Sequence, residues 1–217
     1  MPRAALFDMD RTLVRIETAS LYVRYQREIG EATFADVARV VYWMLQYTAG
    51  IIDAPGVAKR ALRAIEGVPE VVLSARCDDW FRTHVEKHVC DEGRRAVEAH
   101  RQKGEVLAVV TGASEYATRP LGRLLGIPHL LTSELEVGSD GRFTGRFVDP
   151  LCYAEGKITK AEKLAKELGF SLDDATFYSD SYTDLPLLER VAVPVCVNPD
   201  PRLRRVAAKR GWRVESW

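Results

Sequence analysis

Two aspartates separated by one residue follow a short apolar segment near the start of the chain. Residues 4–7 are apolar, and the sequence then continues Asp8-Met9-Asp10-Arg11-Thr12. Such a run is typical of a buried parallel strand, and open α/β sheets place ligand sites just beyond the carboxyl ends of their strands. Because the chain must turn here, both carboxylates can reach one cavity, although residues one apart on a strand point to opposite faces. The feature predicts an α/β sheet whose first strand carries two acidic side chains into a functional site.

Size and composition narrow the class of protein. The chain has 217 residues, enough for one substantial α/β core with an insertion but not for two large domains. Its 31 basic residues balance 31 acidic ones, so we expect no nucleic-acid partner. The four cysteines include no Cys-x-x-Cys pair, and we expect reduced thiols. No segment predicts a signal peptide or stable membrane insertion, which favours a cytoplasmic protein.

Strand and helix signals alternate along most of the chain. Residues from about 15 to 89 show helical spacing with few strand candidates. Later strands are predicted at 106–110, ending at Thr111-Gly112, at 175–178 and at 193–197, and a hairpin is predicted from segments around Leu130 and Leu135, a turn at 139–141 and a return strand at 143–144. We therefore expect an α/β fold with a doubly wound, mostly parallel sheet from residues 1–14 and 90–217, and an all-helical cap inserted at 15–89.

Polar residues with related chemistry stand at the ends of successive predicted elements. In chain order they are Asp8, Asp10 and Thr12, then Thr111 and Gly112, then Lys157, and finally Asp180 and Asp184. Each alone has an ordinary explanation as a turn, a helix cap or a solvated helix face. Together the set resembles the four motifs of the haloacid dehalogenase-like hydrolases, in particular the phosphoserine-phosphatase-like branch, subfamily IB with a helical C1 cap. The resemblance covers roughly residues 3–14 and 92–217, and implies a Rossmann-like core and phosphatase activity.

The resemblance also implies catalytic and metal-binding roles. Asp8 would be the nucleophile that forms an aspartyl-phosphate, and Asp10 would protonate the leaving alkoxide and later accept a proton from water. Because a free Asp titrates near about 3.9, this role requires surroundings that raise the pKa of Asp10. Mg²⁺ is the implied cofactor, held by Asp8, the main-chain carbonyl of Asp10 and Asp180, while Asp184 orients this shell or Lys157.

Three residues are implied to bind the phosphate. The Thr111 hydroxyl and the Gly112 amide would donate hydrogen bonds, and Lys157 would add compensating charge. Many phosphoserine phosphatases have Ser-Gly-Gly at this second motif and an Asn before the last aspartate, whereas this chain has Thr111-Gly112-Ala113 and Thr183. Both departures are compatible with phosphate binding, but they weaken the prediction that the substrate is phosphoserine.

The substrate is predicted from the segment after the first motif. Glu17 lies nine residues after Asp8, where the phosphoserine phosphatases place an acidic residue that meets the substrate's amino group. The alternative is a glutamate favoured by the positive end of a helix. Arg60, or Arg63, stands near the position where that branch has an arginine for the substrate carboxylate. We therefore expect a small, amine-bearing phosphorylated metabolite such as phosphoserine.

Several alternatives stay open at the level of sequence. Within the phosphatases, the substrate could also be histidinol phosphate, phosphocholine, phosphoethanolamine or a lysophospholipid phosphate. The enzyme could also transfer the phosphoryl group to an acceptor other than water. A non-catalytic phosphate-binding regulatory module is the rival from another class. The two aspartates of the first motif argue against that module, because binding alone needs no nucleophile. The protein is expected to be a monomer or homodimer.

Overall fold

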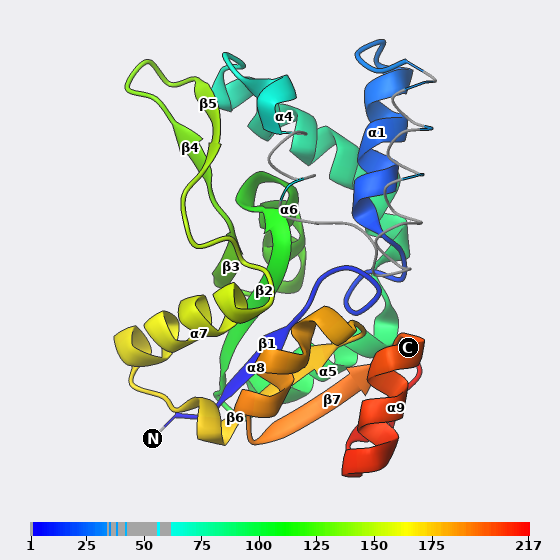
Figure 1. Ribbon diagram of the computed structural model, residues 1–217, viewed down its shortest axis with the longest axis vertical. Coiled ribbons are helices and arrows are strands. Elements are labelled where there is room, and N and C mark those ends of the chain that lie inside the picture. Colours follow the sequence, from blue (N-terminus) through cyan, green and yellow to red (C-terminus); the bar gives the residue numbers. More distant parts are fainter. Residues whose placement is uncertain (1, 34, 36–37, 39–41, 43–55, 57–61) are drawn as a thin grey trace.

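The computed structural model describes residues 2–33, 35, 38, 42, 56 and 62–217 (Figure 1). Its core is a six-stranded, entirely parallel sheet in the order β3-β2-β1-β6-β7-β8. The strands of this sheet are β1 (Ala4–Phe7), β2 (Val106–Ser114), β3 (His129–Ser133), β6 (Ala175–Ser179), β7 (Val193–Val197) and β8 (Arg213–Glu215). Strand β1 is central, so every residue in it is buried.

The alternation of side chains along the central strands divides the core into two layers. On one face Ala5 and Phe7 pack with side chains of α5 (Asp91–Gln102) and α6 (Glu115–Leu125). On the other face Ala4 and Leu6 pack with α7 (Glu155–Leu168), α8 (Leu185–Arg190) and α9 (Pro201–Arg210). Helices on both faces of a parallel sheet define a doubly wound α/β fold, which confirms the predicted fold class.

Two details of the predicted strands were wrong. Strand β2 does not stop at Thr111-Gly112 but continues to Ser114, with a register irregularity against β3 beyond Val110. The segment around Leu130 is not part of a hairpin, because β3 pairs in parallel with β2 in the main sheet. Only β4 (Leu135–Val137) and β5 (Phe143–Phe147) form the antiparallel hairpin, around a turn closed by a hydrogen bond from the Gly141 amide to the Gly138 carbonyl. The length of β2 and the pairing of β3 both depend on contacts between segments that are distant in the sequence.

The helices given for the described residues between 15 and 89 are α1 (Thr18–Glu28), α4 (Glu70–Trp80) and short helical turns at 63–65 and 81–88. Val14 and Val89 form an antiparallel bridge, so the two ends of this segment lie side by side, as an inserted unit requires. In Figure 1 α1 and α4 lie beyond one end of the sheet, and α4 is the nearer of the two to the β4–β5 hairpin. The Phe143 amide of that hairpin donates to the Val68 carbonyl at 3.0 Å. The domain boundaries at 14/15 and 89/90 stay a prediction.

No helix in the described part of the chain combines the length and the apolar character that crossing a membrane requires.

Candidate active site

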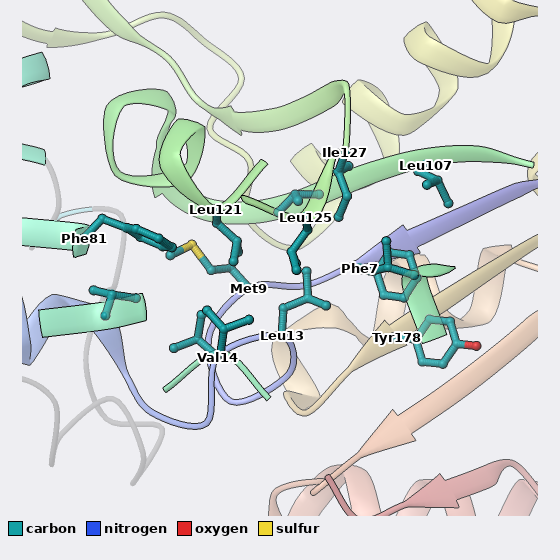
Figure 2. Close-up of a cluster of buried hydrophobic side chains, with 14 of the residues drawn as sticks. Phe7, Met9, Leu13, Val14, Phe81, Leu107, Leu121, Leu125, Ile127 and Tyr178 are labelled. Carbon is teal, nitrogen blue, oxygen red and sulfur yellow. The ribbon is translucent and has the colours of Figure 1, made fainter. Parts of the chain in front are cut away.

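The first motif lies on a loop that buried apolar side chains hold in place. Met9, Leu13 and Val14 are fully buried, and Figure 2 shows them among Phe81, Leu121 and Leu125. The Val14 amide donates to the Met9 carbonyl at 2.9 Å, which closes the turn. Asp8 and Asp10 alternate with the buried Met9 and stand at the carboxyl end of β1. The loop is therefore fixed by packing.

The neighbouring strand β6 brings a second pair of aspartates to the same end of the sheet. Phe7 pairs with Tyr178, and the Asp8 amide donates to the Tyr178 carbonyl at 2.9 Å. Asp8 directly follows β1 and Asp180 directly follows β6, so both aspartates stand at the carboxyl ends of adjacent parallel strands, and both are buried. The fourth motif ends at Asp184, which is also buried and accepts a hydrogen bond from the Ser179 hydroxyl at 2.7 Å. Three carboxylates from two distant segments of the chain therefore lie at one edge of the sheet.

Lys157 is the cation that joins these segments. Its Nζ lies 2.8 Å from Oδ1 of Asp8 and 2.7 Å from Oδ2 of Asp184. The lysine comes from the first turn of α7, and its side chain is only 5% exposed. Gly156 brings the backbone close at this helix start, because a Cβ built there would lie 1.8 Å from the carbonyl oxygen of Leu151.

Burial shifts the acid–base equilibria of the site. Burial raises the pKa of Asp8 above its ordinary value, against the lowering effect of the Lys157 charge. It also raises the pKa of Asp180, helped by the neighbouring charge of Asp8 and opposed by Arg11. For Lys157, burial acts to lower the pKa, but the charges of Asp184 and Asp8 outweigh it and raise the pKa. Lys157 is therefore positively charged at neutral pH.

Asp10 and Glu17 lie together at the start of α1. The Thr18 amide donates to Oδ1 of Asp10 at 3.2 Å, and Glu17 is the residue that precedes the helix. Burial, followed by the charge of Glu17, raises the pKa of Asp10 well above its ordinary value, which agrees with the shift required of a proton donor. Burial raises the pKa of Glu17 above its ordinary value, against the lowering effects of the Arg11 charge and of a hydrogen bond with Asp10. The predicted substrate residue is therefore in contact with the first motif.

The second motif presents one buried and one exposed residue. Thr111 is buried, and its hydroxyl accepts a hydrogen bond from the Ala113 amide at 3.2 Å. Gly112 is exposed, and a Cβ built on it would meet only the carbonyl oxygen of Cys152, at 3.6 Å. The space in front of Gly112 is open to a ligand, as close approach of a phosphate requires.

Sequence reasoning missed two residues of this site. Arg11 directly follows Asp10 in the first motif and was given no role from the sequence, but its Nε lies 3.3 Å from Oδ2 of Asp180. Ser179, at the end of β6, donates a hydrogen bond from its hydroxyl to the Asp184 carboxylate. The position of Ser179 directly before Asp180 was a usable signal, whereas nothing in the sequence indicated where the Arg11 side chain points. Of the predicted substrate residues, Arg60 lies outside the described residues and Arg63 is exposed in a short 3₁₀ turn.

The donor set suits a hard divalent cation. Among the described residues no cluster of three or more His, Cys, Asp or Glu side chains is arranged as a metal site. Mg²⁺ does not require one, because it keeps several waters and binds through one or two carboxylates together with phosphate oxygens. Asp8, Asp180 and the main-chain carbonyl of Asp10 are oxygen donors at the same sheet edge, so these residues fit Mg²⁺.

Comparison with known proteins agrees with this geometry. Residues 5–189 match the haloacid dehalogenase-like hydrolase family. A histidinol-phosphatase of Neisseria meningitidis serogroup C is 31% identical over 99% of this chain and 98% of its own length. A phosphoserine phosphatase of Mycobacterium tuberculosis is 31% identical over 99% of this chain and 70% of its length.

A solved structure is similar as well. The crystal structure of a Bordetella pertussis Tohama I protein of unknown function superposes with a TM-score of 0.89, at 31% identity, over 99% of this chain and 98% of the other. The predicted enzyme class, a phosphatase of this family, is confirmed. The chain belongs to the haloacid dehalogenase-like hydrolases.

Proposed function

We propose that the protein is a Mg²⁺-dependent phosphomonoester hydrolase that works through an aspartyl-phosphate on Asp8. The observation that carries the proposal is the convergence of three motifs on one charged centre, in which Lys157 contacts Asp8 at 2.8 Å and Asp184 at 2.7 Å. A site that only binds phosphate would not place buried carboxylates against an anion. A carboxylate that attacks phosphorus, in contrast, must lie next to the phosphate.

Charge balance supports a divalent cation. A phosphomonoester repels an anionic nucleophile unless cations neutralise its oxygens and hold the reacting atoms in line. Lys157 is already shared by two carboxylates. Mg²⁺ held by Asp8, Asp180 and the Asp10 carbonyl would supply the additional positive charge and polarise the phosphoryl group.

The two aspartates of the first motif then divide the chemistry. A carboxylate oxygen of Asp8 attacks phosphorus, the bond from phosphorus to the substrate oxygen breaks, and Asp10 gives its proton to the leaving alkoxide. In the second half-reaction water attacks phosphorus, Asp10 takes the proton of that water, and Asp8 leaves as a carboxylate. Thr111 and Gly112 would donate to the phosphate oxygens, while Asp184 positions Lys157. Closure of residues 15–89 over the site would exclude bulk water from the first step.

The test is hydrolysis of a chromogenic aryl phosphate with Mg²⁺. Asp8→Asn should abolish turnover, because the amide neither attacks phosphorus nor forms the acyl phosphate. Asp173→Asn is a matched control, since the Asp173 side chain is 74% exposed and contacts Arg190 and the Ser171 hydroxyl. Equal inactivity of the wild-type and Asp8→Asn proteins would instead support a phosphate-binding regulatory module.

For the substrate we propose a small, amine-bearing phosphomonoester. Glu17 supports this, because its carboxylate lies beside Asp10 at the start of α1. The similar proteins are named for histidinol phosphate and phosphoserine, and both compounds carry an amino group. Phosphocholine, phosphoethanolamine and lysophospholipid phosphates are the other candidates.

A metabolite screen with Glu17→Gln tests the substrate class separately from the activity. The variant should lower kcat/KM for histidinol phosphate and phosphoserine more than for amine-free phosphates such as glycerol phosphate, because only the former lose an ion pair. Glu28→Gln, on the same helix but exposed and bonded to His84, is the control. An unchanged ratio between the two substrate groups would contradict the role of Glu17 and leave the phosphatase assignment intact.

A further inference from the structure

Arg11, which directly follows Asp10 in the first motif, has an uncommon backbone conformation. Its φ is +54°, in the left-handed region where glycine and asparagine are favoured and an arginine is rare. Its Nε lies 3.3 Å from Oδ2 of Asp180, and the two side chains are 38% and 9% exposed. Non-glycine residues held in this region cluster at functional sites, because the surrounding structure must maintain them.

The site therefore contains two cations with different attachments. Lys157 makes short contacts to two carboxylates and is almost fully buried. Arg11 makes a single, longer contact through Nε rather than the bidentate pair that guanidinium groups form when they bind a carboxylate strongly. Water reaches more than a third of its side chain. Lys157 is thus a fixed part of the centre, whereas the contact of Arg11 is one that another cation can replace.

The carboxylate that Arg11 contacts is a proposed Mg²⁺ ligand. On the basis of the proposed function, we propose that Arg11 is an internal counter-cation that holds Asp180 when no divalent cation is bound and withdraws when one binds. Its positive charge beside the site opposes the incoming Mg²⁺, so Arg11 sets the Mg²⁺ concentration at which the enzyme becomes loaded. The charge of Arg11 also lowers the pKa of Glu17, so the Glu17 carboxylate is a second partner that the guanidinium can contact after it leaves Asp180.

This role predicts that removing the charge tightens metal binding. A partly exposed ion pair of this kind should weaken Mg²⁺ affinity by roughly fivefold, the upper end of what exposed pairs contribute. Arg11→Asn removes the charge and keeps a residue that tolerates a positive φ, and Arg11→Gly does the same with no side chain at all. Arg11→Lys keeps the charge and should stay close to wild type.

The experiment is titration of the metal-free, full-length protein with MgCl₂ by isothermal calorimetry, in low salt and without substrate. Thermal unfolding at each Mg²⁺ concentration gives a second readout that does not depend on activity. Arg15→Asn is the matched control, because Arg15 lies in the same loop but is exposed and pairs with Glu92. Asp180→Asn should abolish the binding signal, which identifies the site being measured.

We expect Arg11→Asn and Arg11→Gly to bind Mg²⁺ about fivefold more tightly than wild type, and Arg15→Asn to bind as wild type does. Unchanged affinity in both neutral variants overturns the proposal. Weaker affinity overturns it as well, because Arg11 would then orient Asp180 for the metal. If wild type shows no Mg²⁺ signal that depends on Asp180, the metal site of the proposed function fails too, and that result is distinct from the first two.

Discussion

Replacing Lys157 by methionine tests how the centre of the site is held together. Methionine keeps most of the buried volume and removes the charge, so the carboxylates of Asp8 and Asp184 lose the contacts of 2.8 and 2.7 Å. Removing one partner of a buried ion pair typically costs about 3–5 kcal/mol, because the remaining charge stays buried. Here the carboxylates can bind protons or water, so we expect the free energy of unfolding to fall by about 3 kcal/mol.

The assay is urea unfolding near neutral pH with EDTA, followed by circular dichroism. Lys160→Met is the matched control on the same helix: Lys160 contacts Glu134, which is 51% exposed, so its loss should cost less than about 1 kcal/mol. Adding Asp184→Asn to Lys157→Met should recover part of the stability, because one uncompensated charge is removed. A Lys157→Met protein as stable as Lys160→Met would refute the reasoning.

Four further predictions use other parts of the structure. Gly156→Ala should lower the free energy of unfolding by about 2 kcal/mol or more, because its Cβ would lie 1.8 Å from a backbone oxygen; the same urea assay decides this. Gly112→Ala should change the free energy of unfolding by less than about 0.5 kcal/mol, yet lower kcat/KM for an aryl phosphate at least tenfold. Unchanged kinetics would show that no phosphate approaches this residue. Ellman's reagent near pH 8 should label none of the four buried cysteines until urea is added, since burial raises the pKa of Cys77 and Cys152 to about 12. Because unfolded thiols titrate near about 8.5, stability should fall as the pH rises from there toward 12, and rising stability in that range would contradict the prediction.

The parts of the fold that the sequence predicted depend on local patterns. A buried central strand such as β1 is apolar throughout, and the first and fourth motifs each follow a strand-forming segment. Asp8 and Asp180 could therefore be placed at strand ends without knowledge of their partners. The start of α6 also has a local cause, because the Ser114 hydroxyl accepts a hydrogen bond from the Ala117 amide, as serine commonly does at a helix N-terminus.

The parts that the sequence did not predict depend on contacts between distant segments. Strand β8 is short, largely exposed and rich in charge, so it has neither the length nor the alternation of a typical strand; its pairing with β7 alone defines it. The extension of β2 to Ser114 depends in the same way on β3. Arg11 and Asp180 are 169 positions apart in the chain. Their contact goes with a positive φ at Arg11, which cannot be predicted from the sequence because arginine rarely adopts it.

The distribution of charge connects fold and function. Within the described residues, Asp8, Asp10, Glu17, Asp180 and Asp184 gather at one end of the sheet, and the cations that contact them are Lys157 and Arg11. Clustered carboxylates at a buried strand edge oppose folding, since each like charge raises the free energy of its neighbours. A core selected for stability alone would replace them with apolar residues of similar size. Their presence, at the position where the doubly wound topology opens a crevice, is what a site that must accept both a divalent cation and a phosphate requires.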